Sequence, residues 1–285
     1  MDLMRPSRFV SLSALVVVLL LLAVGTAAPQ SAPAGPARLA VTEATLDNGL
    51  RVLVQEDPRN PIVAVQMFYR VGSRNELPGA TGLAHFLEHM MFKGTPTRGR
   101  GQISRLIEQN GGRDNAFTTK DVTGYYVNIA ADRLDLVLGV EADRMRNLLL
   151  DAGEIDSERQ VVMEERRSRI DDDPEGVIYE AMSSLAYVAH PYRAPIIGWM
   201  ADIARINRGE LRAFYDTYYQ PNNAILVIAG DVKADAALAM VRRHFGPIPR
   251  GATPPPMTAV EPPQADERRL VLRKEDAQLP VVNIA

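Results

Sequence analysis

The chain of 285 residues contains no cysteine. This absence excludes a disulfide framework, a thiolate metal site and a cysteine nucleophile. Positive charge is not in excess either, because 32 lysines and arginines stand against 35 acidic residues, for a formal net charge of -3. The chain therefore lacks the basic footprint of a nucleic-acid-binding protein, and we expect no nucleic-acid partner. Histidine is scarce, with four in the chain.

One long apolar run is present, over residues 9–24. Arg5 and Arg8 precede it, and small residues around Ala27 and Ala28 follow it. This order predicts a signal peptide over residues 1–28, cleaved on export to the periplasm or the extracellular space. The alternative is an uncleaved membrane anchor, although the run is slightly short for a span and contains serines. A membrane is a partner only in that second case.

The rest of the chain is globular in composition, with 46% hydrophobic and 24% charged residues. Residues 29–40 form an expected flexible leader. Apolar periodicity and turn residues predict strands at 41–46, 50–55, 62–69, 113–118, 123–130 and 224–229. The same signals predict helices at 81–93, 102–109, 132–149, 152–170, 175–188, 200–218 and 234–245. Since strands and helices are segregated more than alternated, the fold class is α+β, with a mixed, largely antiparallel sheet against which helices pack.

Proline divides the C-terminal part of the chain from the rest. Five prolines fall within residues 254–263, so residues 251–267 read as a linker after one domain at 41–250. Residues 268–273 then read as a strand. A segment as short as 268–285 cannot bury a core, and we expect it to be the start of a truncated second domain.

Two of the histidines, His85 and His89, are four residues apart with Glu88 between them. On a helix both project from one face, and Glu88 lies on the same side. Two imidazoles and a neighbouring carboxylate suit a catalytic zinc ion with a base for its water. The order is the reverse of H-E-x-x-H and is the inverzincin signature. The alternative is a pair of structural histidines, for which this spacing has a chance on the order of one percent.

A third ligand is expected from the predicted helix at 152–170. At about 100° per residue, its apolar stripe contains Ile155, Glu158, Val161, Val162 and Glu165. A carboxylate inside such a stripe is costly unless it is paired or bound to a metal. Glu164 lies outside the stripe and is expected to face solvent. Glu158 and Glu165 are therefore candidates, unless both lie at the edge of the stripe and reach water.

With these motifs the sequence resembles the pitrilysin-type zinc metallopeptidases, the family of insulin-degrading enzyme and the mitochondrial processing peptidase. The resemblance covers roughly residues 41–251. It rests on residues 46–52 (LDNGLRV), 82–95 (GLAHFLEHMMFKGT), 111–118 (GGRDNAFT), 158–165 (ERQVVMEE) and 190–192 (HPY). The second and fourth stretches are specific in combination, because Glu165 follows His89 by 76 residues, similar to the family's spacing.

The resemblance implies a role for each matching residue. His85, His89 and Glu165 are the implied ligands of one zinc ion per chain. Glu88 is the implied general base, and Glu158 is the accessory glutamate that supports the ligands.

The resemblance further implies that Asn115 and Ala116 belong to the strand on which an extended peptide substrate is laid. For Asn115 the alternative is a turn or strand-end residue. His190 and His244 have no partner at ligand spacing and are expected to be structural or exposed.

The implied activity is zinc-dependent endopeptidase chemistry, in which metal-activated water hydrolyses peptides or unfolded protein segments. Enzymes of this family form a chamber from two related domains, and the second supplies an arginine–tyrosine pair that this chain does not reach. A homologous second domain or subunit is therefore the expected partner, together with the peptide substrate. One alternative is a non-catalytic or partner-dependent subunit of a two-chain peptidase. Another is a metal-independent, membrane-anchored binding module.

Overall fold

The computed structural model describes residues 40–274 and 279–284. The predicted signal peptide and all but the last residue of the predicted leader lie outside the described residues. The strands are β1 (Val41–Thr45), β2 (Arg51–Glu56), β3 (Ile62–Tyr69), β4 (Arg113–Thr118), β5 (Thr123–Ala130) and β6 (Ala224–Gly230). The α-helices are α2 (Leu83–Met90), α3 (Gln102–Gln109), α4 (Leu134–Arg146), α5 (Ala152–Arg166), α6 (Pro174–Ala186), α7 (Met200–Ile203), α8 (Arg208–Tyr218) and α9 (Ala234–Phe245). None of these helices is long and apolar enough to span a membrane.

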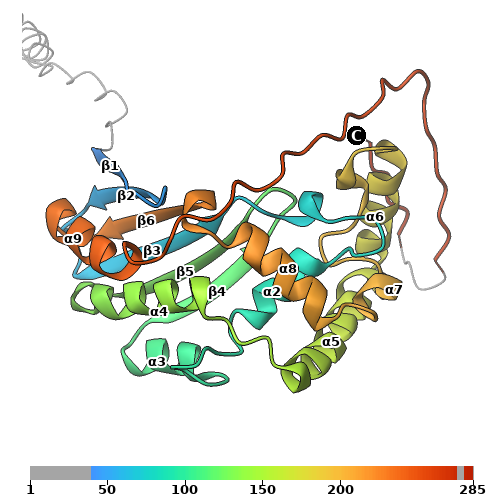
Figure 1. Ribbon diagram of the computed structural model, residues 1–285. Coiled ribbons are helices and arrows are strands. Elements are labelled where there is room, and N and C mark those ends of the chain that lie inside the picture. Colours follow the sequence, from blue (N-terminus) through green and yellow to red (C-terminus); the bar gives the residue numbers. More distant parts are fainter. Residues whose placement is uncertain (1–39, 275–278, 285) are drawn as a thin grey trace, which may run out of the picture. The chain divides into compact units, whose positions relative to one another are not determined.

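The described strands form one six-stranded sheet in the order β1-β2-β6-β3-β5-β4 (Figure 1). β2 and β6 pair in parallel, and the other pairs are antiparallel. The α+β class with a mixed, largely antiparallel sheet is therefore confirmed. β1 and β4 are the two edge strands, so the strand that carries Asn115 and Ala116 has a free edge.

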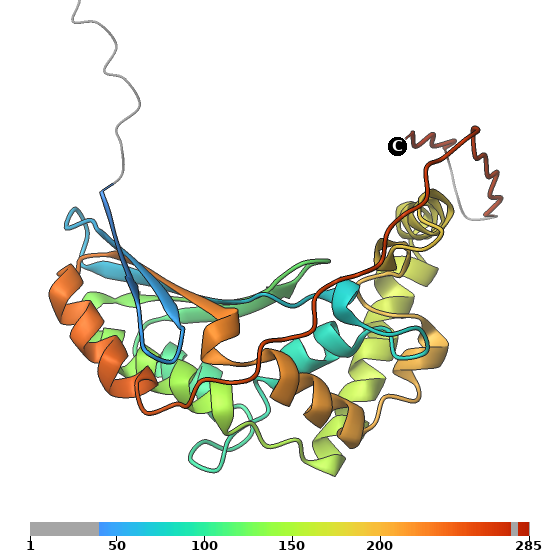
Figure 2. The same cartoon turned by 45° about the horizontal axis from the view of Figure 1, so that its top comes forward.

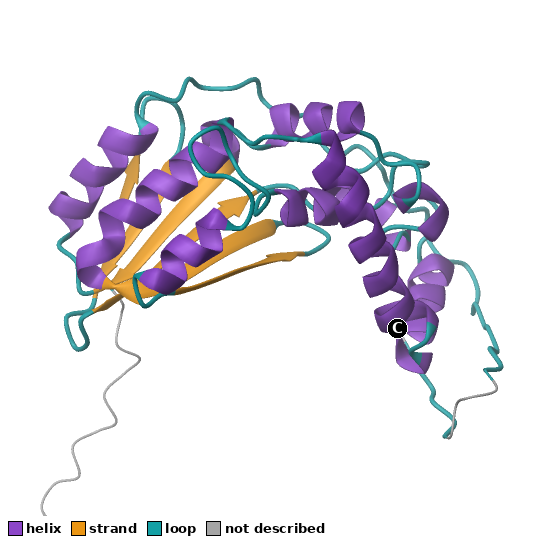
Figure 3. Cartoon of the chain, turned by 90° about the horizontal axis from the view of Figure 1, so that it is seen from below, coloured by secondary structure: helices purple, strands orange, loops and turns teal. Residues whose placement is uncertain are grey.

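The core lies on one face of the sheet. Burial alternates along β2 and β3, and Val52, Val54, Val63, Val65 and Met67 are almost fully buried. This period of two places them all on the face covered by α3, α4 and α9 (Figure 3). Among the described residues no helix covers the opposite face, which is uppermost in Figure 2.

The remaining helices gather beyond one end of the sheet (Figure 1). α2 contacts β4 and β5 on one side and α5 and α8 on the other. Asp151 begins α5 by accepting hydrogen bonds from the backbone of Gly153 and Glu154, as expected for an aspartate at an N-cap. α5 ends in a π-helical segment, Arg167–Asp171, which leads into α6. Residues on α2, α5 and β4 are thereby brought together although they are far apart in sequence.

One predicted helix and one predicted strand are wrong. Residues 200–218 form two helices, because Asn207 and Glu210 make a capping box that begins α8 afresh. Residues 268–273 do not form a strand. Strand-forming side chains are present there, but Leu270, Val271 and Leu272 are exposed, and no strand within the described residues pairs with the segment.

The proline-rich segment at residues 251–267 contacts the chain near the end of α6. Glu261 accepts hydrogen bonds from the backbone N–H groups of Val188, Ala189 and His190 at 2.6–2.9 Å. Arg268 donates to the carbonyl oxygens of Leu185 and Ala186. Polar contacts, not strand pairing, therefore fix this part of the chain.

Candidate metal centre

The two motif histidines lie where the sequence places them, on one face of α2. Their rings are 4.7 Å apart between centroids and meet edge to face. The opposite face of α2 is apolar, and Phe86, Leu87 and Met90 are fully buried in the core. This burial fixes the rotation of the helix, so the histidines point toward α5.

Glu165 on α5 completes a cluster with these histidines. Its Oε2 lies 3.7 Å from Nε2 of His85 and 3.3 Å from Nε2 of His89. One ligand atom from each residue lies within 4.8 Å of the other two. Neighbouring ligand atoms around a tetrahedral zinc ion are roughly 3.4 Å apart, given bonds of about 2.0–2.1 Å. The residues therefore fit a zinc ion in number, type and separation.

Glu158 orients one of the histidines. Its Oε1 lies 2.8 Å from Nδ1 of His89, and its Oε2 forms an ion pair with Lys93. A hydrogen bond at Nδ1 leaves Nε2 of His89 directed at Glu165, the arrangement typical of metal-binding histidines. Nδ1 of His85, in contrast, is buried without a hydrogen-bond partner in the part of the chain that the structure describes.

The predicted exposure is confirmed at two other residues of α5 and wrong at a third. Glu158 is 5% exposed and Glu164 faces solvent, both as predicted. Val161 was expected in the apolar stripe but is 49% exposed. α5 is covered by α2 and α7 along a narrower strip than the sequence pattern predicts, so a residue at the edge of that strip reaches water.

Electrostatics differ sharply between the two histidines. Burial and the neighbouring His89 lower the pKa of His85 to about 4, so this ring is neutral near pH 7. Burial also opposes the charged form of His89, but hydrogen bonds to Glu158 and Glu165 outweigh it and raise the pKa to about 9. The same contacts hold the pKa of both carboxyl groups below the usual range, although burial raises it. A metal ion bound at Nε2 of His89 would compete with a proton on that ring for the negative charge of Glu158 and Glu165.

Glu88 lies beside the cluster without belonging to it. Burial raises its pKa, and a hydrogen bond from the hydroxyl of Thr118 to Oε2, at 2.5 Å, opposes that shift. Thr118 is the last residue of β4, the edge strand. A carboxylate is therefore held between the histidine helix and the free edge of the sheet.

The two residues predicted to contact substrate occupy that edge strand. Asn115 is exposed, Ala116 is half-buried, and the Asn115 side chain accepts a hydrogen bond from the Ala116 N–H. By the alternation of a strand, Ala116 shares the face of Thr118, whereas Asn115 points to the opposite face. Asn115 lies within the strand and is not a turn residue.

The two remaining histidines have structural contacts. Nδ1 of His190 accepts a hydrogen bond from the backbone of Tyr192, and Nε2 of His244 lies 2.6 Å from Asp135. Neither joins the cluster, as predicted.

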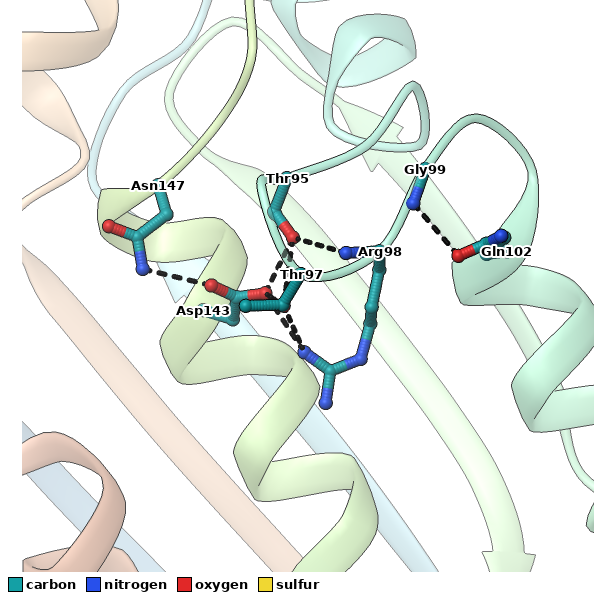
Figure 4. Close-up of polar contacts among 7 residues, drawn as sticks. All are labelled: Thr95, Thr97, Arg98, Gly99, Gln102, Asp143 and Asn147. Atoms are coloured by element: carbon teal, nitrogen blue, oxygen red, sulfur yellow. Dashed lines mark hydrogen bonds and ion pairs between the residues drawn. The ribbon is translucent and has the colours of Figure 1, made fainter.

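The loop after α2 is held by Asp143 on α4 (Figure 4). Oδ2 of Asp143 accepts hydrogen bonds from the hydroxyls of Thr95 and Thr97 and pairs with Arg98, and its Oδ1 accepts one from Asn147. Burial raises the pKa of Asp143, but these donors outweigh it and hold the pKa below its usual value. The loop that follows the histidine helix is thereby connected to α4.

Three contacts were not found from the sequence. The first is the ion pair between Lys93 and Glu158. Lys93 follows His89 by four residues, about one helical turn, so the sequence does contain a signal for a position near the cluster. Thr118 alternates with Ala116 along β4, but nothing in the sequence pairs it with Glu88. Glu76 accepts hydrogen bonds at the start of α2 and lies in an irregular segment without a sequence signal.

Residues 51–199 match the profile of the insulinase family, described as Insulinase (Peptidase family M16). The chain belongs to this family. The match contains every residue of the cluster and is just over half the chain. Residues 205–285 match a second profile, the peptidase M16 inactive domain.

Relatives of this insulinase-family chain include zinc protease PqqE of Helicobacter pylori, 38% identical over 82% of this chain and 54% of that protein. Among solved structures, a protease from Helicobacter pylori superposes with a TM-score of 0.77 at 36% identity, covering 79% of this chain and 55% of the other. The periplasmic protease PqqL of Escherichia coli superposes with a TM-score of 0.72 at 28% identity, covering 79% and 25%. The chain spans about half the length of the curated relatives it matches.

Proposed function

We propose that this chain is the metal-binding half of a zinc-dependent endopeptidase that hydrolyses peptides or unfolded protein segments. The observation that carries the proposal is the convergence of His85, His89 and Glu165. Glu88 lies next to them but accepts its hydrogen bond from Thr118. The three residues would hold one Zn²⁺, which polarises a scissile carbonyl and makes water a stronger nucleophile when bound. Zinc proteases among the relatives support this assignment.

In this proposal Glu88 moves the proton. Thr118 donates to Oε2, so Oε1 is free to accept a proton from the attacking water and pass it to the leaving amine. Burial, which raises the pKa of Glu88, makes its carboxylate a stronger base than an exposed glutamate. Glu158 has a supporting role, because it fixes the ring of His89 through Nδ1.

The substrate would bind as an added strand on β4. The outer edge of β4 is unpaired in the sheet, and an extended peptide satisfies such an edge with main-chain hydrogen bonds. Asn115 and Ala116 lie on this strand, and Thr118 connects its end to Glu88. A peptide bond aligned there would lie near the proposed base.

Coverage of half the length of its relatives supports a second domain or subunit as the partner of this chain. The proposed organisation is a signal peptide at 1–28, a leader at 29–40, a peptidase domain at 41–250, a linker at 251–267 and the start of the second domain at 268–285. Export to the periplasm agrees with the location named for PqqL. The same coverage also fits one alternative, a zinc-bound but non-catalytic subunit of a two-chain peptidase.

Zinc content and peptide turnover test the proposal together. The purified chain is dialysed, its zinc is measured, and cleavage of an unfolded peptide is followed with the chain alone and with a partner supplying the second domain. We expect one zinc ion per chain and turnover at least in the presence of the partner. Absence of zinc would reject the proposal. Zinc with no turnover in either assay would favour the non-catalytic subunit.

A further inference from the structure

The helix that carries both histidines begins without a cap of its own. The N-cap of α2 is Gly82, with φ of 91°, and it has no side chain to accept a hydrogen bond. The first N–H groups of a helix have no partner within the helix and need one from elsewhere. A serine or aspartate usually supplies it at the N-cap.

A side chain at residue 82 is excluded by the backbone of Ile197 and Gly198, which packs against it. A Cβ on Gly82 would lie 2.5 Å from the carbonyl oxygen of Ile197, and a Cβ on Gly198 would lie 2.6 Å from Cα of Gly82. The chain before α7 thus packs directly against the start of α2. Thr81 adds to this contact, since it donates to Asp202 and accepts from the Trp199 N–H. Since residue 82 has no side chain and Thr81 is already hydrogen-bonded elsewhere, the cap must come from another residue.

Glu76 supplies that cap. Its Oε2 accepts from the Gly82 N–H and its Oε1 from the Ala84 N–H, each at 2.8 Å. Both oxygens therefore serve the first turn of α2, and Ala84 is the residue directly before His85. Glu76 is only 6% exposed, so its carboxylate has given up most of its hydration.

The burial of this carboxylate is costly. Burial raises the pKa of Glu76 to about 8, although the two N–H donors and Lys120 oppose the shift. For comparison, Glu56 caps α9 by accepting from the Ala234 N–H at 2.9 Å, and its side chain is 40% exposed. The chain thus caps an ordinary helix with an exposed glutamate but uses a buried one at the histidine helix.

We propose that Glu76 is a positioning residue for the metal site, holding the first turn of α2 so that His85 and His89 face Glu165. This inference rests on the proposed zinc site. Metal–ligand distances tolerate changes of only about 0.2 Å, whereas α2 has only eight residues and is held at its other end by the Asp143 contacts. Release of its first turn shifts His85 relative to Glu165, which lies on a separate helix.

The test compares E76Q with E56Q. Glutamine has one acceptor oxygen and cannot ionise, so E76Q leaves one N–H of α2 without a partner but removes the desolvation cost of a buried carboxylate. E56Q makes the same change at a helix without site residues. Zinc affinity is measured by chelator competition, and Co²⁺ at saturation reports the ligand geometry through its visible spectrum. We expect E76Q to weaken zinc binding about tenfold or more and to change the Co²⁺ spectrum, and E56Q to change neither.

The outcomes separate this inference from the proposed function. No zinc binding by the wild-type chain overturns both. Wild-type affinity and an unchanged Co²⁺ spectrum in a folded E76Q overturn the role of Glu76 alone, as does an equal effect of E56Q. If E76Q does not fold, E76D replaces it, because aspartate keeps the carboxyl group but is too short to serve both N–H groups. Unaltered zinc affinity in E76D would then also overturn the role.

Discussion

The hydroxyl of Thr118 donates a hydrogen bond of 2.5 Å to Oε2 of Glu88, and this contact connects the edge strand β4 with the histidine helix α2. One oxygen of the proposed base is therefore occupied and oriented from the strand proposed to bind substrate. We expect Thr118→Val to lower kcat about tenfold, the effect of a lost hydrogen bond to a charged group, with zinc content unchanged. Thr217→Val makes the same substitution on α8, where the hydroxyl donates to the carbonyl oxygen of Ala213, and is the matched control. Equal kcat in Thr118→Val and wild type would show that the contact is not needed.

Replacement of the proposed base separates chemistry from metal binding. Glu88→Gln keeps the shape of the side chain but loses the proton acceptor, so we expect a loss of about 10²–10⁴ in turnover at equal zinc content. The assay includes a partner that supplies the second domain. Near wild-type turnover would remove Glu88 from the mechanism, and loss of zinc would make it a ligand.

Two neighbouring glutamates on α5 offer a matched pair for the ligand assignment. Glu165 faces the histidines, whereas Glu164 faces solvent and pairs with Arg167. We expect Glu165→Gln to lose most bound zinc after dialysis and Glu164→Gln to keep it, because a neutral amide oxygen is a weaker ligand than a carboxylate. His85→Ala is expected to behave like Glu165→Gln. Full zinc occupancy in either ligand variant contradicts the assignment.

The ionisation of Asp143 makes the free energy of unfolding depend on pH in the acid range. Burial raises its pKa, but the surrounding donors outweigh it, so the folded-state pKa lies below the ordinary value of 3.8. The folded state therefore favours the carboxylate, and its contribution is present above about pH 4 and lost as the pH falls through the lower folded-state pKa. We expect Asp143→Asn to reduce the free energy of unfolding by about 1–3 kcal/mol near pH 7. In urea unfolding between pH 7 and pH 2, the difference from wild type should shrink at acid pH, and a constant difference would refute the linkage.

The N-terminal segment yields a prediction about processing. Arg5, Arg8 and the apolar run after them predict cleavage, so exported material should begin at Ala28 or Pro29. N-terminal sequencing of that material is the measurement. Membrane-bound protein that retains Met1 would instead support an anchor.

Local sequence patterns were sufficient to predict which residues form the candidate cluster, but not which residues contact and support it. The four-residue interval of His85 and His89 and the position of Glu165 in an apolar stripe depend on helix geometry alone. The contacts of Thr118 with Glu88, and of Glu76 with the start of α2, depend on how the end of a strand and an irregular segment pack against the helix. No periodicity encodes such contacts.

The errors have the same origin. Helical propensity continues across residues 200–218, and only the hydrogen bonds of the Asn207–Glu210 capping box divide it. The strand preference of Leu270, Val271 and Leu272 is not realised, because a strand requires a neighbour and the described residues supply none.

The parallel pairing of β2 with β6 has a consequence for how the protein is made. β2 lies near the start of the described chain, whereas its second neighbour, β6, follows every residue of the proposed site. The six-stranded sheet therefore cannot be completed until residue 230 has been synthesised. Strand pairs of such long sequence separation also form slowly. Until then β2 keeps an open edge and α2 has an unfinished sheet to pack on. Premature termination before β6 would consequently leave a chain with all the proposed zinc ligands but without the fold that brings them together.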